Sequence, residues 1–358
     1  MSKKSEIMKI WQECFPSNSP QWRRMFFDSA YSDEEALTSA DPETGATVSS
    51  LLLLPYSMTF HGRSVGVAYV FGAATSRRFR AQGHMSRLMG RALREAADRG
   101  DTFLTVIPPS GSMRIYYRRF DLASVFFSRP MRYTSLHRFP VEGEYIELID
   151  PSPMLLYPAF EQMMSRRRCC VQHTRAQFLT LMDDTRLCGH AFAAVAYPDG
   201  SVAAMVWAEP EMASNVMRVR ELLSEDRDSA CAALTALQRV CPGSPLTLMT
   251  QPADTEAGGD FIPGGMARVV NAESALKAVA AAHPHVRLSI RLRDNLLPEN
   301  SGVYTLRNGD VTVTDDTPCK VDLDLTPSVL TAMLFSSQPI ADITGLPACR
   351  PHMSLMLD

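Results

Sequence analysis

The stretch Thr75–Leu93, TSRRFRAQGHMSRLMGRAL, constrains the fold more than any other part of the chain. It opens with three arginines, Arg77, Arg78 and Arg80, and a lone glycine, Gly83, follows them. Beyond the glycine, apolar residues recur at steps of three and four, which predicts an amphipathic helix. A strand, a basic glycine turn and a helix N-terminus form an anion site, because the first helical amides lack partners and the helix dipole is positive there. We therefore expect a diphosphate-like ligand at this turn, and a solvated basic turn is the alternative.

The length and the amino-acid composition limit the classes of protein to which the chain can belong. The 358 residues are enough for two or three domains, and 46% hydrophobic with 21% charged residues is ordinary for globular proteins. A net charge of −3 argues against a nucleic-acid partner. No run approaches the roughly 18 apolar residues of a membrane helix, and the first residues lack a signal-peptide core. We predict a cytoplasmic protein without a membrane partner. The eight cysteines form no C-x-x-C pair, so we expect idle thiols and no metal.

The N-terminal part has the order of an α/β layer fold. The sequence predicts two helices, the second capped by Ser19 with Pro20 in its first turn. Two strands follow, 47–60 and 63–75, joined by a turn at His61-Gly62 to which we assign no function. The helix after Gly83 and a strand at 101–109 complete the first predicted domain, residues 1–130.

The remaining chain divides into two further predicted domains. In residues 131–265 a hairpin, a helix and a strand repeat the order of the first domain without its basic glycine loop. We read Arg166–Arg168 as a solvated helix face, and 255–265 as a connector. Residues 266–358 mix strands and helices, with a hairpin on Asn308-Gly309. The predicted fold class is α/β, with an α+β domain at the end.

The segment Arg80–Met85, R-A-Q-G-H-M, resembles the acetyl-CoA-binding motif of GNAT acyltransferases, [R/Q]-x-x-G-x-[G/A], and the elements around it match as well. A bulky residue at the last position, here Met85, is a feature of the enhanced intracellular survival (Eis) branch. That branch has tandem GNAT-like domains followed by a sterol-carrier-like domain. The resemblance therefore implies two GNAT-like mixed-sheet domains and a sterol-carrier-like third domain.

The resemblance also assigns residues to acetyl-CoA as co-substrate. The backbone of the strand before the loop would contact the pantetheine arm, and the loop would bind the pyrophosphate. Arg77 or Arg78 would meet the 3′-phosphate, and two serines after the next strand would contact CoA. The residues implied are Ala73, Thr75, Arg78, Arg80, Ala81, Gly83, His84, Ser110 and Ser112.

Two catalytic residues follow from the same resemblance. Eis-type proteins have Y-G-R-F-G-Y where this chain has Y-R-R-F-D-L, starting at Tyr117, so Tyr117 stands at the family's general acid and Tyr116 is the competing assignment. In the Eis branch the terminal carboxylate is the base, which points to Asp358 on an apolar tail that would thread between domains. A frayed terminus is the alternative.

The reading is an acetyl-CoA-dependent N-acetyltransferase that acts by direct transfer on a primary amine, on a small molecule or a lysine. Carboxylates near the second helix, Asp28, Asp33, Glu34 and Glu35, lie where a cationic acceptor would enter. The family forms oligomers, so a homo-oligomer is one of the states that the sequence leaves open. The competing readings are a lipid or small-ligand binding protein with a non-catalytic GNAT domain, and a regulatory CoA sensor.

Overall fold

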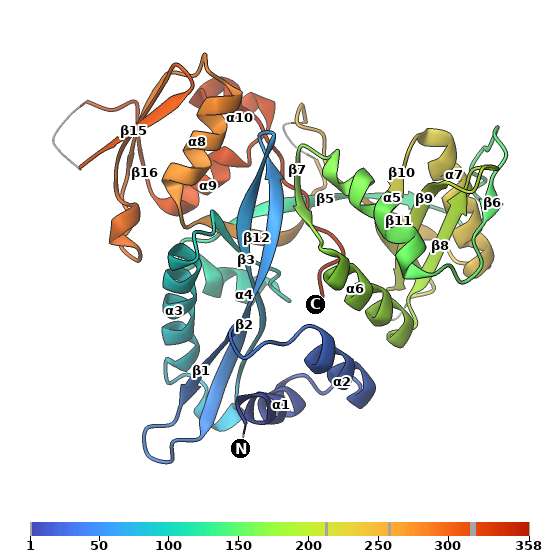
Figure 1. Cartoon of the computed structure of the whole chain (residues 1–358), viewed down its shortest axis with the longest axis horizontal. Helices are drawn as coiled ribbons and strands as arrows, with labels where there is room; N and C mark the ends of the chain where they lie inside the picture. Colours follow the sequence, from blue (N-terminus) through green and yellow to red (C-terminus); the bar gives the residue numbers. More distant parts are fainter. Residues whose placement is uncertain (1, 212–213, 257–258, 316–319, 358) are drawn as a thin grey trace.

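The computed structural model describes residues 2–211, 214–256, 259–315 and 320–357, and it has three units (Figure 1). One mixed sheet runs through the first two units, with the strand order β1-β2-β3-β4-β12-β5-β11-β10-β9-β8-β6 among the described residues and with β7 paired to β2 off this path. The third unit has a smaller sheet of its own, in the order β15-β14-β13-β16. The predicted α/β class with mixed sheets is confirmed.

The first unit has the predicted order of elements. Its helices are α1 (Lys3–Cys14), α2 (Pro20–Ser29), α3 (His84–Asp98) and α4 (Gly111–Arg118), with a 3₁₀ turn at Arg77–Phe79. Its strands are β1 (Ala36–Ala40), β2 (Thr47–Phe60), β3 (Arg63–Thr75), β4 (Phe103–Val106) and β5 (Ala123–Tyr133). The Ser19 hydroxyl caps α2 by accepting from the Trp22 amide, and Pro20 opens the helix, as predicted.

The apolar run at the centre of β2 is explained by burial on both faces of the sheet. Leu51 and Leu53 belong to the core beneath α3 and α4. Leu52 and Leu54 alternate with them and belong to the opposite core, which also holds Trp11 of α1. A strand covered on both faces shows a continuous apolar run instead of an alternation.

The second unit repeats the strand–helix–strand arrangement of the first. Its helices are α5 (Pro153–Ser165), α6 (Arg175–Leu187) and α7 (Arg227–Val240). Its strands are β6 (Ile146–Glu147), β7 (Cys169–Gln172), β8 (Ala191–Ala196), β9 (Val202–Pro210), β10 (Met217–Ser224) and β11 (Leu246–Thr250). β9 is antiparallel to β10 and β11 is parallel to it, as β2 and β4 are to β3.

Three strands tie the units together: β7 of the second unit pairs with β2 of the first, and two others, β5 and β12, lie across the predicted domain boundaries. β5 pairs with β12 (Ile262–Val269) through its first half and with β11 through its second half. β12 lies between β4 and β5 in the first unit's sheet, so the expectation of a connector at 255–265 is wrong for its last residues. The prediction failed because Pro263, Gly264 and Gly265 normally break strands, whereas here they coincide with irregularities in the pairing.

The third unit packs its helices on its own small sheet. It contains α8 (Ala272–Ala282), β13 (Leu288–Leu292), a 3₁₀ turn (Pro298–Asn300), β14 (Gly302–Arg307), β15 (Asp310–Thr314), β16 (Leu323–Leu325), α9 (Pro327–Leu334) and α10 (Gln338–Thr344). Asn308 and Gly309 both have positive φ, 55° and 84°, and form the predicted hairpin turn. Side chains such as Leu276, Ile290 and Leu330 are fully buried and fill the interior of this unit.

Candidate active site

The end of β3 has an open edge. β4 pairs in parallel with β3 from Val67 to Val70 and then stops at Val106. β3 continues to Thr75, and on its other side it stays paired with β2, where Thr75 lies opposite Ser49. Among the described residues, the segment from Phe71 to Thr75 therefore has a strand partner on one side only. Its free backbone groups can bind a ligand that lies along the strand.

A glycine bends this open edge. The β2–β3 register shifts between Phe71 and Ala74, and Gly72 there has φ of 58°. A Cβ on Gly72 would lie 2.0 Å from Cζ2 of Trp11, so both the conformation and the close approach of the indole require glycine. The sequence analysis missed Gly72, although an isolated glycine in an apolar strand is a known signal for a bulge.

The basic loop folds back on the end of β3. Two positive φ values, 62° at Ala81 and 81° at Gly83, shape the loop immediately before α3. The Arg80 side chain donates from Nε to the Thr75 carbonyl oxygen at 3.1 Å. Glu13 of α1 accepts from the Arg77 amide at 2.6 Å, and this hydrogen bond lowers the pKa of its carboxyl. These contacts hold the loop next to the open edge of β3.

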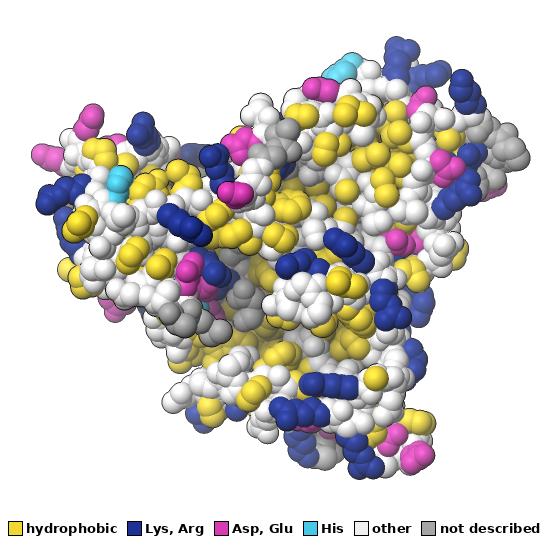
Figure 2. Space-filling model, turned by 180° about the vertical axis from the view of Figure 1, so that it is seen from behind, with side chains coloured by type: hydrophobic (Ala, Val, Ile, Leu, Met, Phe, Trp, Pro, Cys, Tyr) yellow, Lys and Arg dark blue, Asp and Glu magenta, His cyan; other side chains and the backbone are white. Residues whose placement is uncertain are grey.

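The N-terminus of α3 provides the positive end of a 15-residue helix. Amides in a first helical turn have no intrahelical acceptors, and they point outward toward a ligand. The His84 ring turns away from this role, because its Nδ1 lies 2.9 Å from the Ser39 hydroxyl of β1 and 3.2 Å from Arg87. His84 therefore offers its backbone amide to the loop. Figure 2 shows Lys and Arg side chains gathered over the first unit.

The open edge, the loop and the helix end line one pocket of about 690 Å³, which we call the loop pocket. Six of the predicted ligand-binding residues line it: Ala73, Thr75, Arg80, Ala81, Gly83 and His84. The lining also includes Tyr116, the competing acid, and Met85, the last residue of the motif. The sequence analysis did not select the other lining residues, which lie at the end of α1, in β3, in the 3₁₀ turn, in the first turn of α3 and on or just after α4: Cys14, Phe15, Ala74, Phe79, Ser86, Met113 and Arg119.

Three predicted binding residues lie outside this lining. Arg78 is exposed, and its guanidinium stacks on the Phe79 ring at 5.7 Å. Ser110 caps α4 by accepting from the Met113 amide at 3.3 Å, and its hydroxyl lies 2.9 Å from that of Ser112. Both serines are exposed at the N-terminus of α4, next to the helix face that lines the loop pocket.

The two candidate tyrosines lie on different sides of α4. Tyr117 is buried among side chains of the core beneath α3, and burial raises the pKa of its phenol to about 12. Tyr116 lines the loop pocket, and its hydroxyl lies 3.4 Å from the Ser86 hydroxyl of α3. Burial also raises the pKa of Tyr116. Both phenols stay protonated at neutral pH and can donate a proton.

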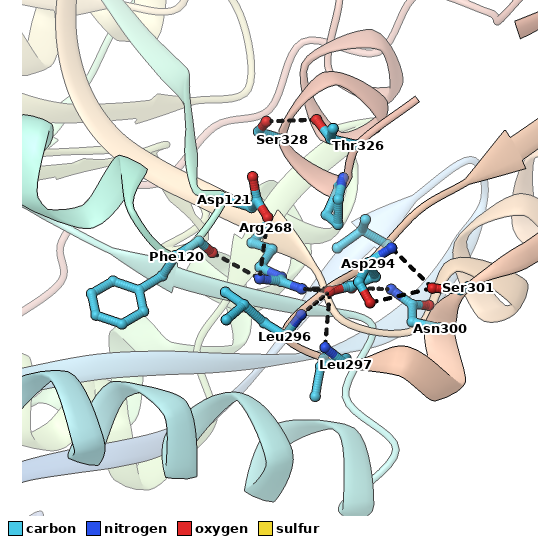
Figure 3. Close-up of polar contacts among 12 residues, drawn as sticks. Phe120, Asp121, Arg268, Asp294, Leu296, Leu297, Asn300, Ser301, Thr326 and Ser328 are labelled. Carbon is cyan, nitrogen blue, oxygen red and sulfur yellow. Dashed lines mark hydrogen bonds and ion pairs between the residues drawn. The ribbon is translucent and has the colours of Figure 1, made fainter. Parts of the chain in front are cut away.

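The turn after α4 is held from two other elements (Figure 3). Asp121 has φ of 57°, a conformation that glycine adopts readily and that aspartate tolerates. The fully buried Arg268 of β12 donates to the Phe120 carbonyl oxygen at 2.9 Å and contacts Asp121 at 3.9 Å. The same guanidinium binds both oxygens of Asp294, in the third unit, at 2.5 Å. The turn therefore keeps the shape of a glycine turn although its residue is an aspartate.

The C-terminal tail enters the molecule between the units, and Figure 1 places the C terminus near its centre, beside α6. Its last described residues, Leu355, Met356 and Leu357, are buried. Arg220 donates to the Met356 carbonyl oxygen at 2.9 Å, and the Tyr69 hydroxyl of β3 donates to that of Leu357 at 3.0 Å. Asp358, the predicted base, lies outside the described residues.

A buried carboxylate holds the middle of the tail. Glu221 of β10 lies 2.8 Å from Nε2 of His352 and binds both terminal nitrogens of Arg167 at 2.7 Å. Burial would raise the pKa of Glu221, but Arg167 and His352 hold it well below its usual range. The run Arg166–Arg168 lies beyond the end of α5, so it is not a helix face as expected. Arg166 and Arg168 are exposed, as predicted, whereas Arg167 is part of the support of the tail.

A second, small pocket of about 140 Å³ lies at the end of the tail, and we call it the tail pocket. Leu357, Glu35 and Tyr56 line it, with parts of α2 and α6. Burial raises the pKa of the Glu35 carboxyl. Of the four predicted carboxylates near α2, Glu35 is the one that lines this pocket. Residues 54–56 of β2 pair with residues 67–69 of β3, so the tail pocket lies alongside β3 upstream of its open edge.

Among the described residues, no group of three or more His, Cys, Asp or Glu side chains is placed to hold a metal ion. Within the same residues, every helix is too short or too polar to cross a lipid bilayer.

Comparison with known proteins identifies two of the three units. Residues 2–124 match the family model of the acetyltransferase (GNAT) domain, and residues 272–344 match that of the sterol carrier protein domain. Residues 2–124 therefore form an acetyltransferase domain of the GNAT type. The layout of the chain, with a sterol carrier domain after the acetyltransferase part, is Eis-like, as the sequence predicted.

Solved structures share this layout along nearly the whole chain. A probable N-acyltransferase from Enterococcus faecalis is 14% identical, with a TM-score of 0.76 over 99% of this chain and 97% of its own. Eis1 from Mycobacterium abscessus is 15% identical, with a TM-score of 0.72 over 99% and 95%. A GCN5-related N-acetyltransferase from Anabaena variabilis is 14% identical, with a TM-score of 0.74 over 98% and 97%. At these identities the likeness establishes the fold. A search of curated proteins finds no match.

Proposed function

We propose that this N-acetyltransferase transfers the acetyl group of acetyl-CoA directly to a primary amine, on a small molecule or on a lysine side chain. The observation that carries the proposal is the loop pocket, where the open edge of β3, the basic loop and the N-terminus of α3 meet. An extended amide-containing arm needs free backbone partners, and a pyrophosphate needs amides and positive charge. The loop pocket offers both kinds of partner side by side.

Each part of acetyl-CoA would be bound by a different segment of the chain around the loop pocket. Ala73 and Thr75 would bind the pantetheine arm through their backbone, because their edge of β3 is open. The amides of the loop and the first turn of α3, with the Arg80 guanidinium, would hold the pyrophosphate. The loop residues in this role are Arg80, Ala81, Gly83 and His84. Arg78 or Arg77 would meet the 3′-phosphate outside the pocket, and Ser110 with Ser112 would contact CoA from α4.

Acetyl transfer needs a proton donor for the leaving thiolate and a proton acceptor for the amine. We assign the donor to Tyr117, which stands at the position of the family's acid, and its raised pKa keeps it protonated. Tyr116 is the alternative, because its side chain lines the loop pocket. We assign the acceptor to the terminal carboxylate of Asp358, because the tail is buried as far as Leu357 and ends against Tyr69 of β3.

The acceptor amine would bind in the tail pocket. Glu35 lines this pocket beside Leu357, and an acidic side chain there attracts a cationic amine. The raised pKa of Glu35 favours its protonated form as the pH falls. Amine binding should therefore weaken toward acidic pH, when the carboxyl becomes neutral.

The lipid-carrier alternative finds less support in the third unit. Large apolar side chains that are almost fully buried fill the space between its helices and its sheet, including Leu276, Ile290, Tyr304 and Leu330. A lipid carrier instead needs an apolar cavity with room for the chain of its ligand. We therefore assign this unit a structural role within the enzyme.

The first test is calorimetric titration of acetyl-CoA into the purified protein and two charge-reversal variants. Arg80→Glu removes a cation that lines the loop pocket, and we expect the affinity to fall about tenfold or more. Arg94→Glu is the matched control, because Arg94 is exposed on α3 away from the lining, and its affinity should stay close to that of the original protein. No binding by the unmodified chain, or equal losses in both variants, would reject the site.

The second test separates the two tyrosines. Replacing the acid by phenylalanine should lower kcat about 10²-fold to 10⁴-fold in an assay that follows release of free CoA with an amine acceptor. The assignment to Tyr117 requires this loss in Tyr117→Phe with unchanged acetyl-CoA affinity. The same loss in Tyr116→Phe alone would move the role to Tyr116. Two fully active variants would exclude both tyrosines as the acid.

A further inference from the structure

A second large pocket lies away from the candidate active site. It has a volume of about 570 Å³, within the range of sites that bind small molecules, and we call it the hairpin pocket because the β2–β3 turn forms one wall. The segment 165–168 after α5, the end of α8 and Cys349 at the start of the tail form the rest. The lining shares no residue with the loop pocket or the tail pocket, and none of its residues has a role in the proposed acetyl transfer.

The hairpin pocket lies where the three units meet. Figure 1 shows the tip of the β2–β3 hairpin of the first unit between α8 of the third unit and β7 of the second. These walls are held together, because β7 pairs with β2 immediately before the turn and the Thr59 hydroxyl donates to the Arg167 carbonyl oxygen at 2.7 Å. A ligand in this pocket would therefore touch all three units on a framework of paired strands.

The lining of the hairpin pocket is basic. Among the described residues it holds four arginines and two histidines, and it contains no aspartate or glutamate. Basic side chains gathered without acidic ones attract an anion, and the arginine fork matches the oxygens of a phosphate. The basic residues are Arg63, Arg166, Arg167, Arg168, His61 and His283.

Two of the arginines have charge to offer a ligand. Arg63 is exposed at the start of β3, and no acidic side chain of the described structure pairs with it. Arg168 has 71% of its side chain exposed, and its contact with Asp254 is long, at 3.5 Å. The other two arginines pair with glutamates that lie outside the lining. The pocket therefore has positive charge in excess of its acidic partners.

Two histidines meet at this pocket. Nδ1 of His61 lies 3.0 Å from Nε2 of His283, with the ring planes nearly perpendicular at 87°. One proton lies between these two nitrogens, so one ring donates to the other. The remaining ring nitrogen of His61, Nε2, is buried and has no hydrogen bond of ordinary geometry in the described structure. A buried polar atom without a partner costs free energy, and a ligand oxygen bonded to it would remove that cost.

The protonation of the pair decides how many donors it offers. When both rings are neutral, the pair holds two protons, one shared and one on an outward nitrogen. When one ring is protonated, Nε2 of His61 and Nδ1 of His283 both become outward donors. Burial and the positive charges of His61, His285 and Arg168 lower the pKa of His283, which opposes this state. An anion in the pocket would offset the repulsion and favour the charged pair.

We propose that the hairpin pocket binds the phosphate group of a small hydrophilic molecule, held by Arg63, Arg168 and the two histidines. A phosphate monoester carries nearly two negative charges and three terminal oxygens, which suits two guanidinium forks and two imidazole donors. The volume of the pocket leaves room for the organic part of such a molecule. The rest of the lining is polar or small, and it has no large apolar side chain for a lipid. The proposal does not depend on acetyl transfer.

The first test titrates inorganic pyrophosphate into the full-length protein with isotope-labelled histidine and follows the ring signals by NMR. His61→Asn and His283→Gln assign the two signals, and asparagine tolerates the positive φ of 47° at His61. We expect both signals to shift saturably, and the pH midpoint of His283 to rise by about one pH unit when pyrophosphate is bound. Two histidine signals that do not respond to pyrophosphate would overturn the proposal.

Charge reversals separate this site from the loop pocket, which also attracts pyrophosphate. Arg63→Glu should lower the affinity read from the two histidine signals about tenfold, with circular dichroism confirming that the variant is folded. Arg80→Glu in the loop pocket should leave this affinity unchanged. Arg94→Glu, at an exposed position of α3 outside both linings, is the control for the change in net charge. Histidine shifts that disappear in Arg80→Glu, or that Arg63→Glu does not weaken, would reject the site.

The organic part of the ligand is tested by comparing a hexose phosphate with inorganic phosphate at the same two histidine signals. Both titrations use Arg80→Glu, so that binding in the loop pocket contributes little. Tighter binding of the hexose phosphate would support a site for a phosphorylated small molecule. Equal or weaker binding would reject that part of the proposal and leave a site for the inorganic ion only.

Discussion

The buried ion pair between Arg268 and Asp294 gives the sharpest prediction about stability. Both side chains are fully buried, and they meet at 2.5 Å across the boundary between the first and third units. Asp294 also accepts from the amides of Leu296 and Leu297 at 3.0 and 2.9 Å and from the Asn300 side chain at 3.1 Å (Figure 3). Asp294→Asn keeps the size and an acceptor oxygen, but it leaves the buried Arg268 charge with the half-exposed Asp121, 3.9 Å away, in place of its close counter-ion.

The expected cost follows from this geometry. Removing one partner of a fully buried pair costs about 3–5 kcal/mol, because the remaining charge keeps its desolvation penalty. Arg268→Met in the same chain removes that charge. The double variant should therefore be more stable than the sum of the two single losses predicts, by about 2 kcal/mol. Urea unfolding measured on all four proteins gives the coupling energy directly.

The three tryptophans make the assay selective. Trp11 and Trp22 lie in the first unit and Trp207 in the second, so fluorescence reports on these units and circular dichroism on the whole chain. If the Arg268–Asp294 ion pair joins the units, Asp294→Asn should lower the urea midpoint of the fluorescence transition as well as that of the circular dichroism transition. A shift seen only by circular dichroism, or a coupling energy below about 0.5 kcal/mol, would refute the reasoning.

Two further predictions concern single sites. Gly72→Ala should destabilise the protein by about 3 kcal/mol in urea unfolding, because the added Cβ meets Trp11 and the φ of 58° is strained. Gly90→Ala, in α3 with no atom within 4 Å of its added Cβ, should instead stabilise it by about 1 kcal/mol. Burial lowers the pKa of His173 to about 4. Between pH 6.5 and 4 the unfolded chain therefore binds a proton at His173 that the folded protein does not bind. The free energy of unfolding should fall by about 3 kcal/mol over this range. His173→Phe should remove most of that slope, whereas His285→Gln at an exposed site should keep it, and equal slopes in all three proteins would contradict this origin.

Local signals in the sequence predicted the local structure well. The Ser19 cap, the His61-Gly62 turn and the start of α3 after Gly83 each depend on a few adjacent residues, and the structure has all three. The loop residues of the motif also line one pocket, because a turn and the helix that follows it are contiguous in the chain. Adjacent residues with strong conformational preferences are the part of a fold that sequence patterns describe best.

Sequence patterns did not predict the contacts between residues that are far apart in the chain. Gly265 reads as a strand breaker, but a Cβ there would lie 2.4 Å from Cε of Met353, so this glycine makes room for the tail. Arg167 reads as part of a solvated charge run, but its partner Glu221 is 54 residues away. Tyr116 and Tyr117 are adjacent, and which of them lines the pocket depends on how α4 packs, which their spacing alone does not define.

These contacts also suggest why a sterol carrier domain is attached to an acetyltransferase. The third unit reaches the candidate active site by two routes. Through Asp294 it fixes Arg268, and Arg268 holds the turn at the end of the helix that carries both candidate tyrosines. Through the tail it delivers Leu357 to Tyr69 on β3, upstream of the open edge. Large apolar side chains of the unit, such as Leu276 and Leu330, are fully buried, and together with these two supports they favour the structural role proposed for it.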